Sequence, residues 1–81
     1  MTTYTHEVTI NGITYAGIVT EDRDAGMASE TVTASGYGIV HSAEFHARYL
    51  GLASRDEYVR VMTASIAKSH QRAMKRATMA T

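Results

Sequence analysis

Apolar and polar residues alternate along two runs near the start of the chain, residues 4–10 and 13–19. This period of two is typical of β-strands that bury one face. Asn11-Gly12 separates the runs, and a two-residue turn of type I′ needs positive φ at both central positions. The turn fixes the register, so each further pair lies one residue outward on both strands. The pattern therefore predicts an antiparallel hairpin with these pairs on its mainly apolar face: Ile10–Ile13, Val8–Tyr15, His6–Gly17 and Tyr4–Val19.

A second β-rich stretch follows the hairpin. Residues 21–29 are mostly polar, and Gly26 is the expected turn residue between the two stretches. Residues 30–40 are again rich in β-branched and aromatic side chains, which favour strands. We therefore expect a third antiparallel strand from Glu30 to Val40, in which the small residues 34–36 and Gly38 indicate a bulge or a close backbone approach.

From Ser42 onward the apolar spacing lengthens to three or four residues, which is typical of helices. Ser42 is the expected N-cap of a short helix that places Phe45, Tyr49 and Leu50 on one side. Gly51 follows as the expected C-terminal stop of that helix, because glycine readily adopts the left-handed conformation required there.

A long second helix is predicted to begin after Ser54 and to run to about Ala77. Ser54 and Glu57 have the spacing of a capping box, in which each side chain satisfies a free backbone N–H at the helix start. The apolar stripe expected to face the sheet contains Val59, Met62, Ile66, Ala73 and Ala77, with Tyr58 and His70 at its edges.

These elements predict a single α+β domain over residues 1–81, in the order β-β-β-α-α, with both helices packed on one face of the sheet. The large side chains expected in its core are Val8, Ile10, Ile13, Tyr15, Val19, Phe45, Leu50, Leu52, Val59, Met62 and Ile66. Because this core is small and the chain contains no cysteine, we also expect association into a homodimer.

The net charge is zero, but the two halves of the chain have opposite charge. Residues 1–41 contain five acidic residues against one basic, and residues 42–81 contain three acidic against seven basic. The two halves could simply face each other, or the basic half could bind nucleic acid or an acidic protein surface. The candidate residues for such binding are Arg60, Lys68, Arg72, Lys75 and Arg76. The last four exceed what is needed to complement the negative end of a helix dipole.

Catalytic and metal-binding motifs were not found in the sequence. His41, Glu44 and His46 are close together, but helical spacing would turn His46 away from the other two. The chain has no His-Glu-x-x-His, no Gly-x-Ser-x-Gly and no cysteine ligand, and Gly36-Tyr37-Gly38 lacks the third small residue of a dinucleotide-binding loop. We expect a protein that is not an enzyme and has no metal or cofactor.

The N-terminus and the hydropathy profile predict the cellular location. Met1 is followed by Thr-Thr-Tyr-Thr rather than by a basic segment and an apolar run, so no signal peptide is expected. No apolar run approaches the 18 or more residues of a membrane-spanning helix. We therefore expect a cytoplasmic protein without membrane contact.

Residues 50–60 read Leu-Gly-Leu-Ala-Ser-Arg-Asp-Glu-Tyr-Val-Arg. This stretch resembles the link between the two helices of ribbon–helix–helix repressors, although Ala53 is an extra residue and Asp56 stands where the family often has Ser. In that family a short strand before the first helix pairs across a dimer and reads the DNA major groove. The resemblance implies a small transcriptional regulator that binds nucleic acid, although residues 31–40 contain no Lys, Arg, Asn or Gln.

In its small size, zero net charge and lack of cysteine or catalytic motif, the chain is similar to anti-CRISPR proteins of phages and mobile elements. Those proteins bind a host complex and block its nucleic-acid or effector surface. The resemblance implies a phage-encoded inhibitor that acts in the host cytoplasm on a larger protein or ribonucleoprotein complex. The main hypothesis is thus a binding protein that occludes or regulates such a partner; the alternatives are a nucleic-acid-binding regulator that uses the basic helix and a virion assembly subunit.

Overall fold

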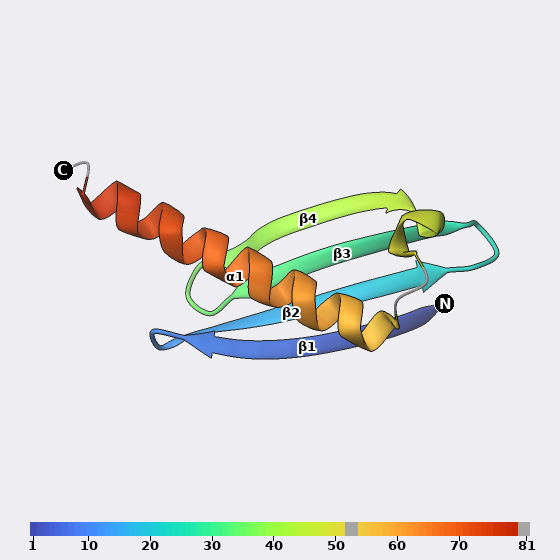
Figure 1. Ribbon diagram of the computed structural model, residues 1–81, viewed down its shortest axis with the longest axis horizontal. Coiled ribbons are helices and arrows are strands. Elements are labelled where there is room, and N and C mark those ends of the chain that lie inside the picture. Colours follow the sequence, from blue (N-terminus) through green and yellow to red (C-terminus); the bar gives the residue numbers. More distant parts are fainter. Residues whose placement is uncertain (52–53, 80–81) are drawn as a thin grey trace.

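A computed structural model places a four-stranded antiparallel sheet under one long helix (Figure 1), and it describes residues 1–51 and 54–79. The sheet order is β1-β2-β3-β4, and the architecture is α+β. The elements are β1 (Thr2–Ile10), β2 (Ile13–Asp22), β3 (Met27–Ala34), β4 (Gly38–His46), the 3-10 helix η1 (Ala47–Leu50) and α1 (Arg55–Met79). None of the helices described is both long and apolar enough to cross a membrane.

The N-terminal hairpin is confirmed in turn and in register. Asn11 and Gly12 have φ of 51° and 78°, the positive values that a type I′ turn requires. Ile10 pairs with Ile13 and Val8 with Tyr15, as expected. The side chains that face α1 are accordingly more buried than their neighbours along both strands.

The next stretch forms two strands where one was expected. β3 ends at Ala34 and β4 begins at Gly38, with a tight turn between them in which the Tyr37 amide donates to the Ala34 carbonyl at 2.9 Å. Gly36 and Gly38 have φ of 82° and 78°, which glycine adopts without steric cost. The small residues therefore mark a turn, while the bulge in this pair of strands lies between Val32 and Thr33 of β3 and their partners.

The prediction of a short helix from Ser42 is wrong, because residues 38–46 form the edge strand β4. Its half-buried residues His41, Ala43 and Phe45 alternate with exposed ones, which is the period of a strand. The chain becomes helical only in η1, and Gly51 ends that element with φ of 69°. Tyr49, expected on the same side as Phe45, is 65% exposed.

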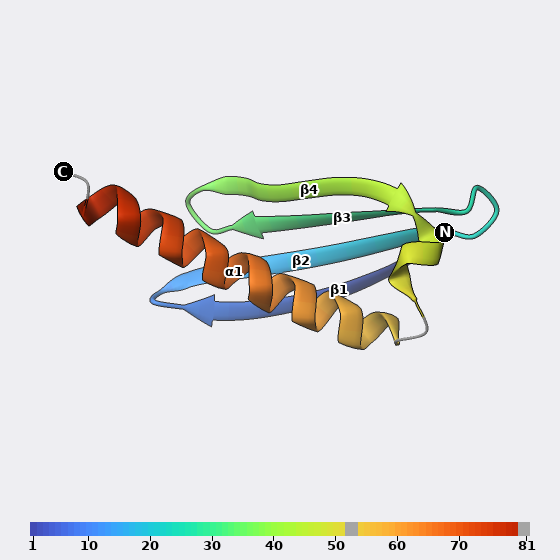
Figure 2. The same ribbon diagram turned by 45° about the horizontal axis from the view of Figure 1, so that its top comes forward.

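α1 begins at Arg55, directly after Ser54, and the Ser54 side-chain bond of the predicted capping box is present. The Ser54 Oγ accepts a hydrogen bond from the Glu57 amide at 3.1 Å. α1 crosses β1 and β2 obliquely, and its C-terminal end extends past the β1–β2 and β3–β4 turns (Figures 1 and 2). Ala73 and Ala77, expected to pack on the sheet, are consequently exposed.

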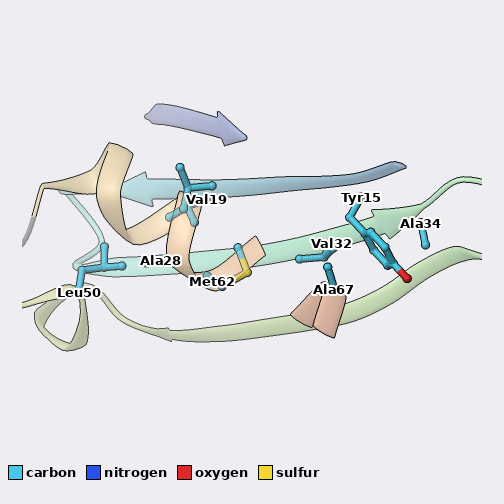
Figure 3. Packing of buried hydrophobic residues seen from close by; sticks show 9 residues of the cluster. Tyr15, Val19, Ala28, Val32, Ala34, Leu50, Met62 and Ala67 are labelled. Carbon is cyan, nitrogen blue, oxygen red and sulfur yellow. The ribbon is translucent and has the colours of Figure 1, made fainter. Parts of the chain in front are cut away.

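The core lies between the sheet and the first half of α1 (Figure 3). Its buried apolar residues are Tyr15, Val19, Ala28, Val32, Ala34, Leu50, Val59, Met62 and Ala67. Five of the expected core residues are only half-buried, namely Val8, Ile10, Ile13, Phe45 and Ile66, and Leu52 lies outside the described residues. At the centre α1 packs directly on backbone, since a Cβ added at Gly17 would lie 1.7 Å from Thr63 Oγ1.

Candidate functional site

The C-terminal part of α1, residues 68–78, carries a basic face and is called here the basic arm. Lys68, Arg72, Lys75 and Arg76 are all exposed, as the helical spacing predicted. Arg72 donates to Ser69 Oγ at 3.2 Å, and in the part of the chain that the structure describes none of the four forms an ion pair with a carboxylate. Arg60 lies two turns earlier and approaches Glu57 at 3.9 Å, so it stands apart from this group.

Hydrogen bonds to the hairpin hold the base of the basic arm in place. Gln71 Nε2 donates to the Ile10 carbonyl at 3.1 Å, and Asn11 Nδ2 donates to Gln71 Oε1 at 2.9 Å. The Tyr15 hydroxyl lies 2.6 Å from His70 Nδ1. Asn11, expected only as a turn residue, thus also fixes the direction in which the basic arm projects.

The sheet has an open face, turned away from α1, whose charge is opposite to that of the basic arm. Threonine is frequent on this face, and its charged strand residues are Glu7, Asp22 and Glu44. No lysine or arginine of the described strands lies on it. Among the described residues, Arg55 is the one base of the second half that forms an ion pair with an acid of the first. The two halves of the chain therefore form one ion pair, Glu21–Arg55, while Glu7 and Asp22 of the first half lie on the open face and the basic arm belongs to α1 on the other side of the sheet.

Glu21 of β2 is the acidic residue that forms the ion pair with Arg55. This residue is 5% exposed, and its carboxylate accepts hydrogen bonds from Arg55 Nε and Nη2, both at 3.1 Å. These bonds hold the pKa of Glu21 below its ordinary value of 4.5, against the opposing effect of burial. The bidentate pair fastens the first turn of α1 to the sheet.

Glu30 of β3 is the second buried carboxylate, 8% exposed. Its Oε1 accepts a hydrogen bond from the Tyr58 hydroxyl and its Oε2 lies beside His41 Nε2, each at 2.5 Å. Burial, assisted by the hydrogen bond to Glu30, raises the pKa of Tyr58 to about 12. An open hollow of about 310 Å³ adjoins this group and is lined by Glu30, Tyr58, Val61, Met62, Ser65 and Ile66. We call it the Glu30 hollow.

Sequence reasoning missed the Glu30 group, although a signal was present. Ala28, Glu30 and Val32 alternate along β3 in step with its buried positions. An acidic residue at such a position is unusual, because buried carboxylates need a compensating partner. The partners come from β4 and α1, whose arrangement the local sequence does not reveal.

The structure also separates the histidines that were considered as metal ligands. His41 pairs with buried Val32 on the side facing α1, whereas His46 pairs with Met27 and is exposed on the open face. Within the described residues, no three His, Asp or Glu side chains are grouped so that they could hold a metal ion.

Comparisons with known proteins add no relative: no family model, curated protein or solved structure matches this chain. The candidate sites are therefore defined by their own chemistry. They are the exposed basic arm, the acidic open face of the sheet and the Glu30 hollow beside α1.

Proposed function

We propose that this chain is a non-enzymatic binding protein that attaches to a larger protein or ribonucleoprotein complex and occludes or regulates it. The observation that supports the proposal is the projection of the basic arm. The C-terminal end of α1 extends past the β1–β2 and β3–β4 turns (Figure 2), and of residues 72–78 only Met74 is half-buried while the others are exposed. A helix segment that buries so little within its own chain is available for a surface of opposite charge.

The chemistry of the basic arm favours a surface rich in carboxylates or phosphates. Lys68, Arg72, Lys75 and Arg76 recur every three or four residues, so their side chains lie along one side of the helix. Because Gln71 and Asn11 fix the base of the basic arm, little conformational freedom of the backbone is lost when a partner binds. Complementary charges of this kind mainly speed association and orient the partner.

Three features favour a protein surface over free nucleic acid. The net charge of zero gives little long-range attraction to a polyanion. The open face presents Glu7, Asp22 and Glu44 rather than bases. The strand before the ribbon–helix–helix-like corner is β4, whose open-face residues include Glu44 but no lysine or arginine, which is unsuited to reading DNA. A phage-encoded inhibitor of a host defence complex, as the anti-CRISPR resemblance implies, is one protein of this kind.

The proposal is tested by replacing Lys68, Arg72, Lys75 and Arg76 together with Gln. The matched control replaces two exposed bases outside the basic arm, Arg23 and Arg48, with Gln. Tagged protein is used to capture partners from cell lysate with and without nuclease, and captured proteins are identified by mass spectrometry. We expect a partner that survives nuclease, is lost with the arm variant and is kept by the control.

A parallel titration with duplex DNA and with RNA at 150 mM salt separates the alternatives. The proposal expects no binding at micromolar protein. Micromolar or tighter binding would overturn it in favour of the nucleic-acid-binding regulator, particularly if log affinity falls against log salt by about 0.9 per phosphate contact. Capture of coat or scaffold proteins would instead support a virion assembly subunit.

A further inference from the structure

Glu30 is a buried carboxylate that has no permanent cation beside it. Its partners are the Tyr58 hydroxyl and the His41 ring, and no described lysine or arginine lies within ion-pair distance of it. Buried carboxylates are ordinarily paired with a cation, because removal from water strongly disfavours the charged form. An ionised carboxylate has about four acceptor positions, and these two partners use two of them.

Glu30 is one of the residues that line the Glu30 hollow, which is open to solvent. The walls of the hollow are mostly apolar, from Val61, Met62 and Ile66, and Val61 is itself 53% exposed at the outer side of the helix. Ser65 and Tyr58 add hydroxyl groups. The neighbour of Glu30 on β4 is Ala43, which adds only a methyl group, while the His41 ring of the same strand contacts Glu30 Oε2.

We propose that the Glu30 hollow binds a protonated alkyl amine. The ammonium group would occupy the free acceptor positions of the Glu30 carboxylate, and a short methylene stem would lie against Val61, Met62 and Ile66. Two sources share this chemistry: a free amine and the lysine side chain of a partner. The site lies on the flank of α1 that faces β4, apart from the basic arm, so it does not depend on the proposed function.

The test is a titration of ¹⁵N-labelled protein with n-butylammonium chloride at constant ionic strength, followed by NMR. n-Butanol, with the same stem and no charge, is the matched control ligand. We expect saturable shifts of the Glu30, Ala43 and Ser65 amide signals, and at least tenfold weaker binding of butanol. Glu30→Gln should remove the response, while Glu44→Gln, which changes an exposed carboxylate on the open face of the sheet, should retain it.

Substitution of Ser65 provides a second test that does not alter Glu30. Ser65→Lys places an ammonium group on the wall of the Glu30 hollow, so it should raise the melting temperature and remove the butylammonium response. Ser65→Gln is the uncharged control and should keep the response. Equal binding of butanol and butylammonium, or equal responses of the two Ser65 variants, would overturn the proposal.

Two blocked tripeptides then distinguish the sources, Ala-Lys-Ala and its norleucine analogue. If lysine of a partner is the ligand, Ala-Lys-Ala should bind more tightly than butylammonium and should also shift amide signals of β4. If a free amine is the ligand, butylammonium should bind at least as tightly as the peptide. In both cases the norleucine peptide should bind at least tenfold more weakly than Ala-Lys-Ala, and equal binding of the two peptides would count against the site.

Discussion

Two glutamates are buried side by side on the sheet face that α1 covers, and their surroundings differ. Glu21 pairs with Ala28 across β2 and β3, and Glu30 pairs with Val19, so the two carboxylates are diagonal neighbours. Their partners on α1, Arg55 and Tyr58, are three residues apart on the helix. Glu21 accepts two hydrogen bonds from one guanidinium group, whereas Glu30 contacts a hydroxyl group and an imidazole ring.

This difference separates a structural site from a binding site. The Glu21–Arg55 pair has matched charges and bidentate geometry, so it fixes the start of α1 and has little capacity for a further ligand. Glu30 retains free acceptor positions and adjoins the Glu30 hollow, whose lining residues include no lysine, arginine or histidine. A buried charge left partly compensated in this way lowers stability and favours a ligand that completes it.

The close contact between Gly17 of β2 and Thr63 of α1 should give the largest effect on the unfolding free energy. Gly17→Ala places a methyl group 1.7 Å from Thr63 Oγ1, so α1 must move away from the sheet above both carboxylates. We expect a loss of about 3 kcal/mol in unfolding free energy, measured by urea denaturation. The double variant Gly17→Ala/Thr63→Ala should recover part of the loss. No recovery would show that the strain lies elsewhere.

Removal of the Arg55 guanidinium, the cation that pairs with Glu21, should give the next largest loss of stability. Arg55→Met leaves Glu21 buried without its main partner, and the unfolding free energy should fall by clearly more than about 1 kcal/mol. The matched control is Arg60→Met, whose carboxylate partner is exposed and which should change little. A loss no larger than the control's would mean that the Glu21–Arg55 pair does not stabilise the fold.

The same variant predicts a change in acid stability. The pKa of Glu21 is lowered in the folded state, so its stabilising effect is present above 4.5 and is lost as the pH falls below that value. The urea midpoint of the natural sequence should therefore fall below pH 4.5. In Arg55→Met this decrease should be smaller, because the folded-state pKa of Glu21 is no longer held down.

Elements of the fold could be predicted from the sequence where the interactions that form them lie close together along the chain. The hairpin was predicted with its register because Asn11-Gly12 and the flanking alternation are contained within one short segment. Residues 42–50 were misread because the spacing of Phe45 and Tyr49 also fits a helix, and pairing with β3 decides between the two. That pairing is not visible within the segment.

The candidate sites follow the same division. Exposure of the four bases was predicted from helical spacing, but their projection depends on where the sheet ends beneath a helix of 25 residues. The position of Glu30 on a buried face could be inferred from Ala28 and Val32. Its partners Tyr58 and His41 could not, because they come from separate elements that meet only in the folded chain.

Substitution of Tyr58 should have a smaller effect on stability and tests the surroundings of Glu30 specifically. The pKa of Tyr58 is raised to about 12, so the folded state keeps this proton between pH 10 and 12 while the unfolded chain loses it. Stability should therefore fall over that range, and absorbance at 295 nm should show one tyrosine that ionises near pH 12. Tyr58→Phe should remove this late step and cost about 1.5 kcal/mol at pH 7, through loss of the hydrogen bond to a charged acceptor. If the late step remains in the variant, another tyrosine produces it.

Glu30→Gln should have the smallest effect on stability. The amide oxygen of Gln can still accept a hydrogen bond from Tyr58, and the amide group can still pair with the ring of His41. At the same time an incompletely paired buried charge is removed, which offsets what is lost. We therefore expect a change of about 1 kcal/mol or less in unfolding free energy, in either direction. Glu21→Gln provides the comparison, because it leaves the Arg55 guanidinium without its carboxylate and should be clearly destabilising. If the two Gln variants lose equal stability, the two sites are equally closed, and the distinction between a structural and a binding carboxylate is wrong.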